Sequence, residues 1–127
     1  MYKYLDLNTE YYNGLIESLG KEAIAEIIID QVPVNFETYT KQIEEGIASG
    51  NIDSIRRAVH TLKSDFRHFI PVDHEFIKFI QDFENLAKEA GENNAETDFS
   101  AVYAKFKEMS EGPLDEIKKL GVEYKNA

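Results

Sequence analysis

The sequence predicts an all-α fold, an antiparallel up-down four-helix bundle with a short N-terminal lead-in helix and room for a short C-terminal helix. Three observations predict it. The chain has 127 residues, a length suited to one domain with one hydrophobic core. Its apolar residues recur at spacings of three and four, and no segment shows the period of two typical of a strand. Only seven glycines and three prolines interrupt these patterns, so we treat residues 1–127 as a single domain with a bundle core over about 20–112.

The first half of the chain contains the lead-in helix and one long helical pattern. The lead-in helix is expected over residues 10–18. In 21–31 the apolar side chains share one face, and they include Ala23, Ile24, Ile27 and Ile28. Pro33 has no backbone N–H group, so we expect a kink or a break there. The pattern resumes over 36–47 and ends at Gly50, which suits a C-terminal cap.

The second half predicts three further helices. Asn51 or Asp53 is placed to start a helix over 52–70, whose buried stripe is the cleanest in the chain: Ile52, Ile55, Val59, Leu62, Phe66 and Phe69. Pro71 stops this helix, and Asp73 is expected to cap a successor that ends at Gly91. A last pattern over 99–109 ends before Gly112-Pro113, and the remaining tail has room for a further short helix packed against the others.

Composition excludes several classes of protein. Lys and Arg number 14 and Asp and Glu 24, a formal net charge of −10. Nucleic acids and anionic membranes are therefore not expected partners, because phosphate contacts need clustered cations. The absence of cysteine excludes disulfides, thiolate zinc sites and cysteine nucleophiles. No apolar run is long enough for a signal peptide or a membrane span, so we expect a cytoplasmic protein. A monomer is the simplest expectation for its oligomeric state.

The helix over 52–70 also carries a candidate site opposite its buried stripe. The side chains expected to line up along one exposed strip are Arg56, His60, Lys63, Ser64 and Arg67. This helix has four cations and two carboxylates on an otherwise acidic chain. Histidine is a nucleophile near neutral pH, and neighbouring cations stabilise the negative charge of a phosphoryl group. The strip therefore predicts a phosphoryl acceptor at His60.

No other pattern predicts a metal, cofactor or nucleotide site. His68 and His74 are six residues apart and do not form a metal pair at a spacing of four. The paired Glu-x-x-His motifs of a di-iron bundle and a glycine-rich phosphate loop are both missing.

The segment 58–64, Ala-Val-His-Thr-Leu-Lys-Ser, resembles the His-x-x-Lys signature of histidine-containing phosphotransfer (HPt) domains, in which Gly usually follows the lysine. The flanking segments 43–51 and 83–86 are similar to the helices beside the histidine in that family, and the similarity covers roughly residues 20–110. This chain departs from the family in having Ser64 for the usual glycine. It also has Ile70-Pro71 where another glycine is usual, and Phe69, Ile70 and Pro71 are expected to form an apolar rim for a partner.

The resemblance implies a role for each matching residue. His60 would carry the phosphoryl group on Nε2, Lys63 would contact the phosphoryl oxygens, and Glu84 would accept a hydrogen bond from Nδ1 of His60. The loop before Glu84 differs in length from the family pattern, so Gln81 and Asp82 remain alternatives for this contact. Partner contacts are assigned to Arg56, Ser64 and Arg67.

The resemblance implies a phosphorelay protein of a two-component system rather than an enzyme. It would pass a phosphoryl group between aspartates of receiver domains, in response regulators or hybrid histidine kinases, and would not act as a kinase itself. The receiver would supply the metal ion, so no cofactor of the chain's own is expected. The alternatives are a non-catalytic helical adaptor of HPt type that binds a receiver or kinase, and an unrelated acidic bundle that self-associates.

Overall fold

The computed structural model describes residues 2–93 and 96–126, and all regular secondary structure in these residues is helical. The elements are α1 (Glu10–Leu19), α2 (Lys21–Ile24), a π-helical turn η1 (Ala25–Ile29), α3 (Gln31–Ser49), α4 (Ile52–Arg67), α5 (Glu75–Glu92) and α6 (Ser100–Lys125). The predicted all-α class and the lead-in helix are confirmed. None of these helices combines the length and the apolar character needed to cross a membrane.

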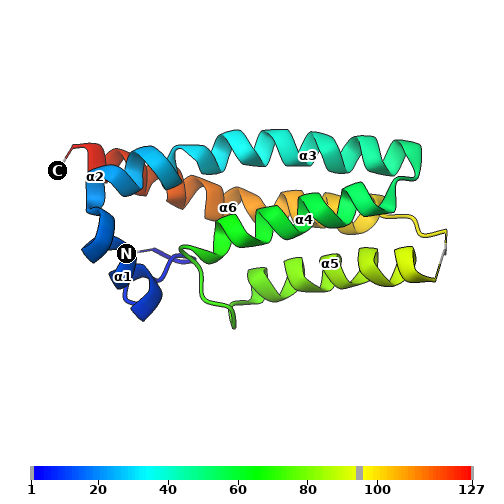
Figure 1. The fold of residues 1–127 in the computed structure, drawn as a ribbon, viewed down its shortest axis with the longest axis horizontal. Helices are drawn as coiled ribbons and strands as arrows, with labels where there is room; N and C mark the ends of the chain where they lie inside the picture. The colour runs from blue at the N-terminus through cyan, green and yellow to red at the C-terminus, as the bar shows by residue number, and fades with distance from the viewer. Residues whose placement is uncertain (1, 94–95, 127) are drawn as a thin grey trace.

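Four long helices lie side by side along the long axis of the molecule (Figure 1). α3 packs against α4, α4 against α5, α5 against α6, and α6 against α3. Consecutive long helices run in opposite directions, and both termini lie at the end of the molecule that holds α1 and α2. This arrangement places one face of α4 and the neighbouring face of α5 at the surface.

Aromatic side chains hold α4, α5 and α6 together. The rings of Phe66 and Phe76 pack edge to face with centroids 4.8 Å apart, and the ring of Phe106 lies 5.9 Å from that of Phe83. All four side chains are buried. The core extends beyond the expected range of 20–112 at both ends, where the buried residues are Leu5, Tyr12, Ile117, Leu120 and Tyr124.

The break expected at Pro33 lies earlier, in the π-helical turn. The backbone N–H of Asp30 donates to the carbonyl oxygen of Ala25 at 2.9 Å, five residues back. A π-turn adds residues to one turn and so rotates the positions that follow, which leaves Ile27 exposed and buries Ile29. The expectation that Ile27 shares the buried face is therefore wrong. Pro33 lies in the first turn of α3, where a backbone N–H has no partner within the helix.

The turn between α3 and α4 has the expected chemistry. Gly50 has φ 73°, in the left-handed region that glycine adopts without steric cost. Of the two predicted caps it is Asn51 that starts α4, since its side chain accepts a hydrogen bond from the backbone N–H of Ser54 at 3.1 Å. These contacts fix the start of the helix that carries the candidate site.

Three helix boundaries differ from the prediction. α5 is capped by His74 rather than Asp73, because the Nδ1 atom of His74 accepts a hydrogen bond from the backbone N–H of Phe76 at 3.0 Å. α4 ends at Arg67 instead of continuing to 70, and α5 ends one residue past Gly91.

The tail does not form the separate short helix for which the sequence left room, because α6 continues through Pro113 to Lys125. A proline inside a helix costs about 3 kcal/mol. On the far side of Pro113, however, Ile117, Leu120 and Tyr124 are buried. Fully burying a large apolar side chain contributes about 1.5–3 kcal/mol, so burial of this half of the helix outweighs the cost of the proline.

Candidate functional site

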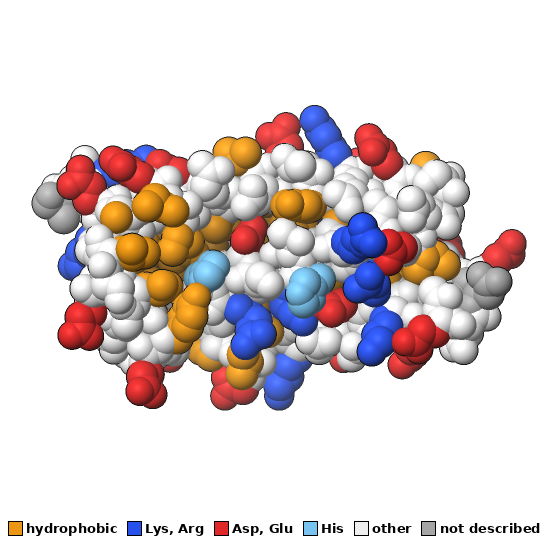
Figure 2. Space-filling view, viewed as in Figure 1, with side chains coloured by type: hydrophobic (Ala, Val, Ile, Leu, Met, Phe, Trp, Pro, Cys, Tyr) orange, Lys and Arg blue, Asp and Glu red, His pale blue; other side chains and the backbone are white. Residues whose placement is uncertain are grey.

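The candidate site is built on the packed pair α4 and α5. Ile55, Val59, Leu62 and Phe66 of α4 point into the core, as the spacing predicts. Ala58 is buried as well, whereas Ile52 is only half-buried. His60 lies on the other side of the helix, and 58% of its side chain is exposed. Figure 2 shows Lys and Arg side chains gathered on this face, over α4 and α5.

The imidazole of His60 is held from one side by α5. Its Nδ1 atom lies 3.2 Å from both carboxylate oxygens of Glu84, which is the contact expected from the sequence. The alternatives are not used, because Gln81 bonds elsewhere and Asp82 is exposed with no contact to His60. The other ring nitrogen, Nε2, makes no hydrogen bond to any residue in 2–93 or 96–126. It is therefore the nitrogen free to react.

Lys63 is not on the exposed strip, and that part of the prediction is wrong. Only 9% of its side chain is exposed, and its ammonium Nζ lies 2.7 Å from Oε1 of Glu84 and 2.7 Å from Oε1 of Gln81. The position three residues after His60 faces α5, and the long apolar stem of a lysine can lie in such an interface while its charged end finds oxygen partners. Nζ therefore already has two oxygen ligands in this structure.

A supporting contact comes from Asn85, which the sequence interpretation missed. The side-chain amide Nε2 of Gln81 donates to Oδ1 of Asn85 at 2.9 Å, so the amide oxygen of Gln81 is turned toward Lys63. Gln81, Glu84 and Asn85 have the spacing of three and four that places side chains on one face of a helix. This spacing in the sequence could have indicated that Asn85 lies beside Gln81 and supports it.

Glu84 is ionised at neutral pH because of its neighbours. Burial alone would raise its pKa, but hydrogen bonds from Lys63 and His60, together with the positive charge of Lys63, outweigh burial and hold the pKa of Glu84 below its ordinary value. An ionised carboxylate only accepts hydrogen bonds, so Nδ1 of His60 must carry the proton. The lone pair of the imidazole is then on Nε2, the ring nitrogen that does not contact Glu84.

The predicted partner-binding residues differ in how they are placed. Arg56 is bound within α4, since its Nη2 lies 2.8 Å from Oδ1 of Asp53. The hydroxyl of Ser64 donates to the backbone oxygen of His60 at 3.2 Å, which folds this small side chain against the helix. Arg67 is exposed and takes part in no ion pair among the described residues. Ser64 and Arg67 thus remain available beside His60.

The expected apolar rim is only partly present. Phe69 and Ile70 are buried in the core, so they do not form a rim. Pro71 is half-buried, and the exposed apolar side chain of this loop is Val72. Among residues 2–93 and 96–126, no group of three or more His, Cys, Asp or Glu side chains is placed to hold a metal ion.

Comparison with known proteins adds no identification: the chain matches no protein-family model, no curated protein and no solved structure.

Proposed function

We propose that this chain is a histidine-containing phosphotransfer protein of a cytoplasmic phosphorelay, in which His60 carries the phosphoryl group between aspartates of receiver domains. The observation that carries the proposal is the state of His60: its ring is held at Nδ1 by Glu84 while more than half of the side chain remains exposed. We also assign α3, α4, α5 and α6 to an antiparallel up-down four-helix bundle, supported by their cyclic packing and alternating direction.

The proposed reaction is a reversible in-line transfer. The lone pair on Nε2 of His60 attacks the phosphorus atom of a receiver phospho-aspartate, the N–P bond forms, and the O–P bond to the aspartate breaks. The receiver carboxylate leaves with the electron pair. The proton on Nδ1 stays on the ring, and the positive charge that develops on the phosphorylated imidazole faces the Glu84 carboxylate. No cofactor of the chain's own enters the reaction, and the receiver supplies the metal ion.

Lys63 acts in this proposal through Glu84. Because Nζ is bound by Glu84 and Gln81, it keeps the carboxylate ionised and fixed in place. A direct contact with phosphoryl oxygens, as the family resemblance implies, requires Nζ to leave one of these two partners. Lys63 is therefore a positioning residue in the resting protein.

A second candidate is a non-catalytic adaptor that binds a receiver or a kinase without carrying phosphate. The buried ammonium of Lys63 favours it, because Nζ is already bound by Glu84 and Gln81 and is not free to meet a phosphoryl group. The exposed and oriented imidazole favours transfer, since binding alone has no need for a defined tautomer.

The test is incubation with receiver domains phosphorylated on aspartate, followed by measurement of label on this chain. We expect acid-labile, base-stable label that is lost in His60→Gln. His74→Asn is the matched control, because asparagine also caps a helix and this variant removes a different imidazole. Label that persists in His60→Gln excludes His60 as the carrier, and binding to a receiver without any label supports the adaptor.

A further inference from the structure

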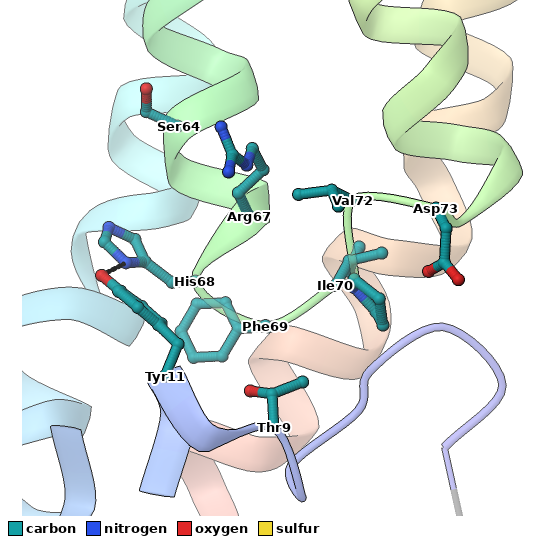
Figure 3. A pocket seen from close by; sticks show the side chains of 10 residues that line it. Thr9, Tyr11, Ser64, Arg67, His68, Phe69, Ile70, Val72 and Asp73 are labelled. Atoms are coloured by element: carbon teal, nitrogen blue, oxygen red, sulfur yellow. Dashed lines mark hydrogen bonds between the residues drawn. The ribbon is translucent and has the colours of Figure 1, made fainter. Parts of the chain in front are cut away.

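A groove of about 710 Å³ opens where α4 ends, beside the strip that carries His60. Phe69 and Ile70 lie at its base, and α1 contributes Tyr11 to one wall (Figure 3). Its opposite side is formed by the loop before α5, where Val72 is 58% exposed. The groove therefore offers apolar surface that the chain itself does not cover.

The wall from α1 is fixed in place by a contact with α4. The hydroxyl of Tyr11 and Nδ1 of His68 are 2.8 Å apart, and the two rings stack with centroids at 5.8 Å. The backbone N–H of Asp6 also donates to the carbonyl oxygen of Phe69 at 2.8 Å. The groove is thus a preformed feature of the fold, and the lead-in segment is part of it.

The groove and His60 lie within reach of a single docked domain. Ser64 and Arg67 line the groove, and they follow His60 on α4 by four and seven residues. Seven residues of α-helix span about 10 Å. A typical stable interface covers about 800 Å² of each partner, so a domain that reaches His60 also covers the opening of the groove.

Arg67 offers a carboxylate of a partner a cation at the opening of the groove. Arg67 and Lys78 line a neighbouring hollow, and neither takes part in an ion pair among residues 2–93 and 96–126. Arg56 and Arg57, by contrast, are both bound to Asp53. The groove contains one carboxylate, Asp73, which lies on the far side of Val72 from Arg67 (Figure 3). Asp82 also lines the neighbouring hollow, so Arg67 and Lys78 are accompanied by two carboxylates, and Arg67 is the cation that lies next to the apolar wall.

We propose that this groove is the docking subsite for the receiver domain, which inserts an apolar side chain against Val72 and Tyr11 and pairs a neighbouring carboxylate with Arg67. The proposal rests on the proposed function, since it takes the partner to be the domain that exchanges phosphate with His60. It divides the tasks on the surface: His60 performs the chemistry, and the groove determines the affinity and the choice of receiver.

The experiment measures both binding and transfer with a purified receiver domain. Val72→Asp places a charge on the apolar wall, and Arg67→Glu reverses the charge at the opening. The matched control is Val122→Asp, because Val122 is 60% exposed but lies on α6 and does not line the groove. Circular dichroism and sedimentation of each variant report its fold and its oligomeric state.

We expect Val72→Asp to weaken receiver binding about tenfold or more, as loss of a central interface anchor does, with an unchanged transfer rate at saturating receiver. Arg67→Glu should slow association and reduce its dependence on salt, and Val122→Asp should bind like the wild type. Wild-type binding by both groove variants overturns the proposal even if His60 is still labelled. A changed oligomeric state in Val72→Asp assigns the groove to a second copy of the chain and also overturns it. If the wild type binds the receiver but is never labelled, the proposed function fails, while the groove is still judged by the binding of its variants.

Discussion

Removing the charge of Glu84 tests the central ion pair of the site. Oε1 of Glu84 lies 2.7 Å from Nζ of Lys63, whose side chain is only 9% exposed, so Glu84→Gln leaves a buried ammonium with neutral partners alone. A hydrogen bond to a charged group contributes about 1.5–3 kcal/mol, and a buried charge with no partner costs about 3–5 kcal/mol. Because Lys63 keeps the oxygen of Gln81, we expect a loss of about 2 kcal/mol in the free energy of unfolding. For a chain of this length that lowers the melting temperature by about 6–8 °C.

A double-mutant cycle separates this pair from its surroundings. Lys63→Met keeps an apolar stem in the interface and leaves Glu84 with His60 and partial access to water. The double variant, neutral at both positions, should lose about 1–2 kcal/mol less stability than the sum of the single variants. Urea unfolding followed by circular dichroism measures all four proteins. Single effects that add within about 0.5 kcal/mol would refute the pairing.

The stability that Glu84 contributes should depend on pH. The pKa of Glu84 in the folded chain lies below its ordinary value of 4.5, so the unfolded chain binds more protons as the pH falls below that value. The stability contributed by Glu84 is therefore present above pH 4.5 and is lost as the pH falls through the lower, folded pKa. The difference between wild type and Glu84→Gln should shrink in that acidic window.

Three further predictions concern the elements that position the site. Asn51→Ala removes the side-chain cap of α4 and should cost about 1 kcal/mol, seen as a lower urea midpoint, whereas Asn51→Asp keeps the cap. Gly46→Ala should cost about 1–3 kcal/mol by urea unfolding, because the added Cβ would lie 2.7 Å from Cγ1 of Ile55, and an unchanged midpoint would contradict this packing. Burial holds the pKa of His68 below 6.5 although the charge of a nearby carboxylate opposes it, so stability should fall as the pH drops below 6.5. His68→Gln, which keeps an acceptor for Tyr11, should flatten that slope in unfolding curves measured at several pH values.

The sequence predicts the fold well where the apolar spacing is regular, and poorly where it is not. In α4 the spacing identified most of the buried face because, apart from Ala58, all the remaining positions are polar. In the segment 25–29, Ala-Glu-Ile-Ile-Ile, adjacent isoleucines fit either a normal or a widened turn, so the pattern does not reveal the π-turn. At Pro113 the local rule predicts a break, and only the burial of the residues beyond it shows why the helix continues.

The candidate site divides in the same way. The contact between His60 and Glu84 joins two helices and was expected from a family resemblance, not from spacing within either helix. The burial of Lys63 depends on how α5 is rotated against α4, a property of packing that the sequence of α4 does not contain. Asn85 lies in the same helix as Gln81, four residues further on, so this contact could have been predicted from the sequence.

The shared carboxylate gives a way to decide how Lys63 takes part in transfer. If Lys63 acts through Glu84, then Lys63→Met removes the hydrogen bond and the charge that lower the pKa of Glu84, and the carboxylate becomes easier to protonate. Transfer by Lys63→Met should then decline more steeply than wild-type transfer as the pH is lowered from 8 toward 5, because a protonated Glu84 no longer fixes the tautomer of His60. If Lys63 instead contacts the phosphoryl oxygens directly, the loss is similar at every pH. Transfer rates with one phosphorylated receiver, measured in parallel on the wild type, Lys63→Met and His74→Asn, cancel the receiver's own pH dependence, and a constant ratio of Lys63→Met to wild type would refute the action through Glu84.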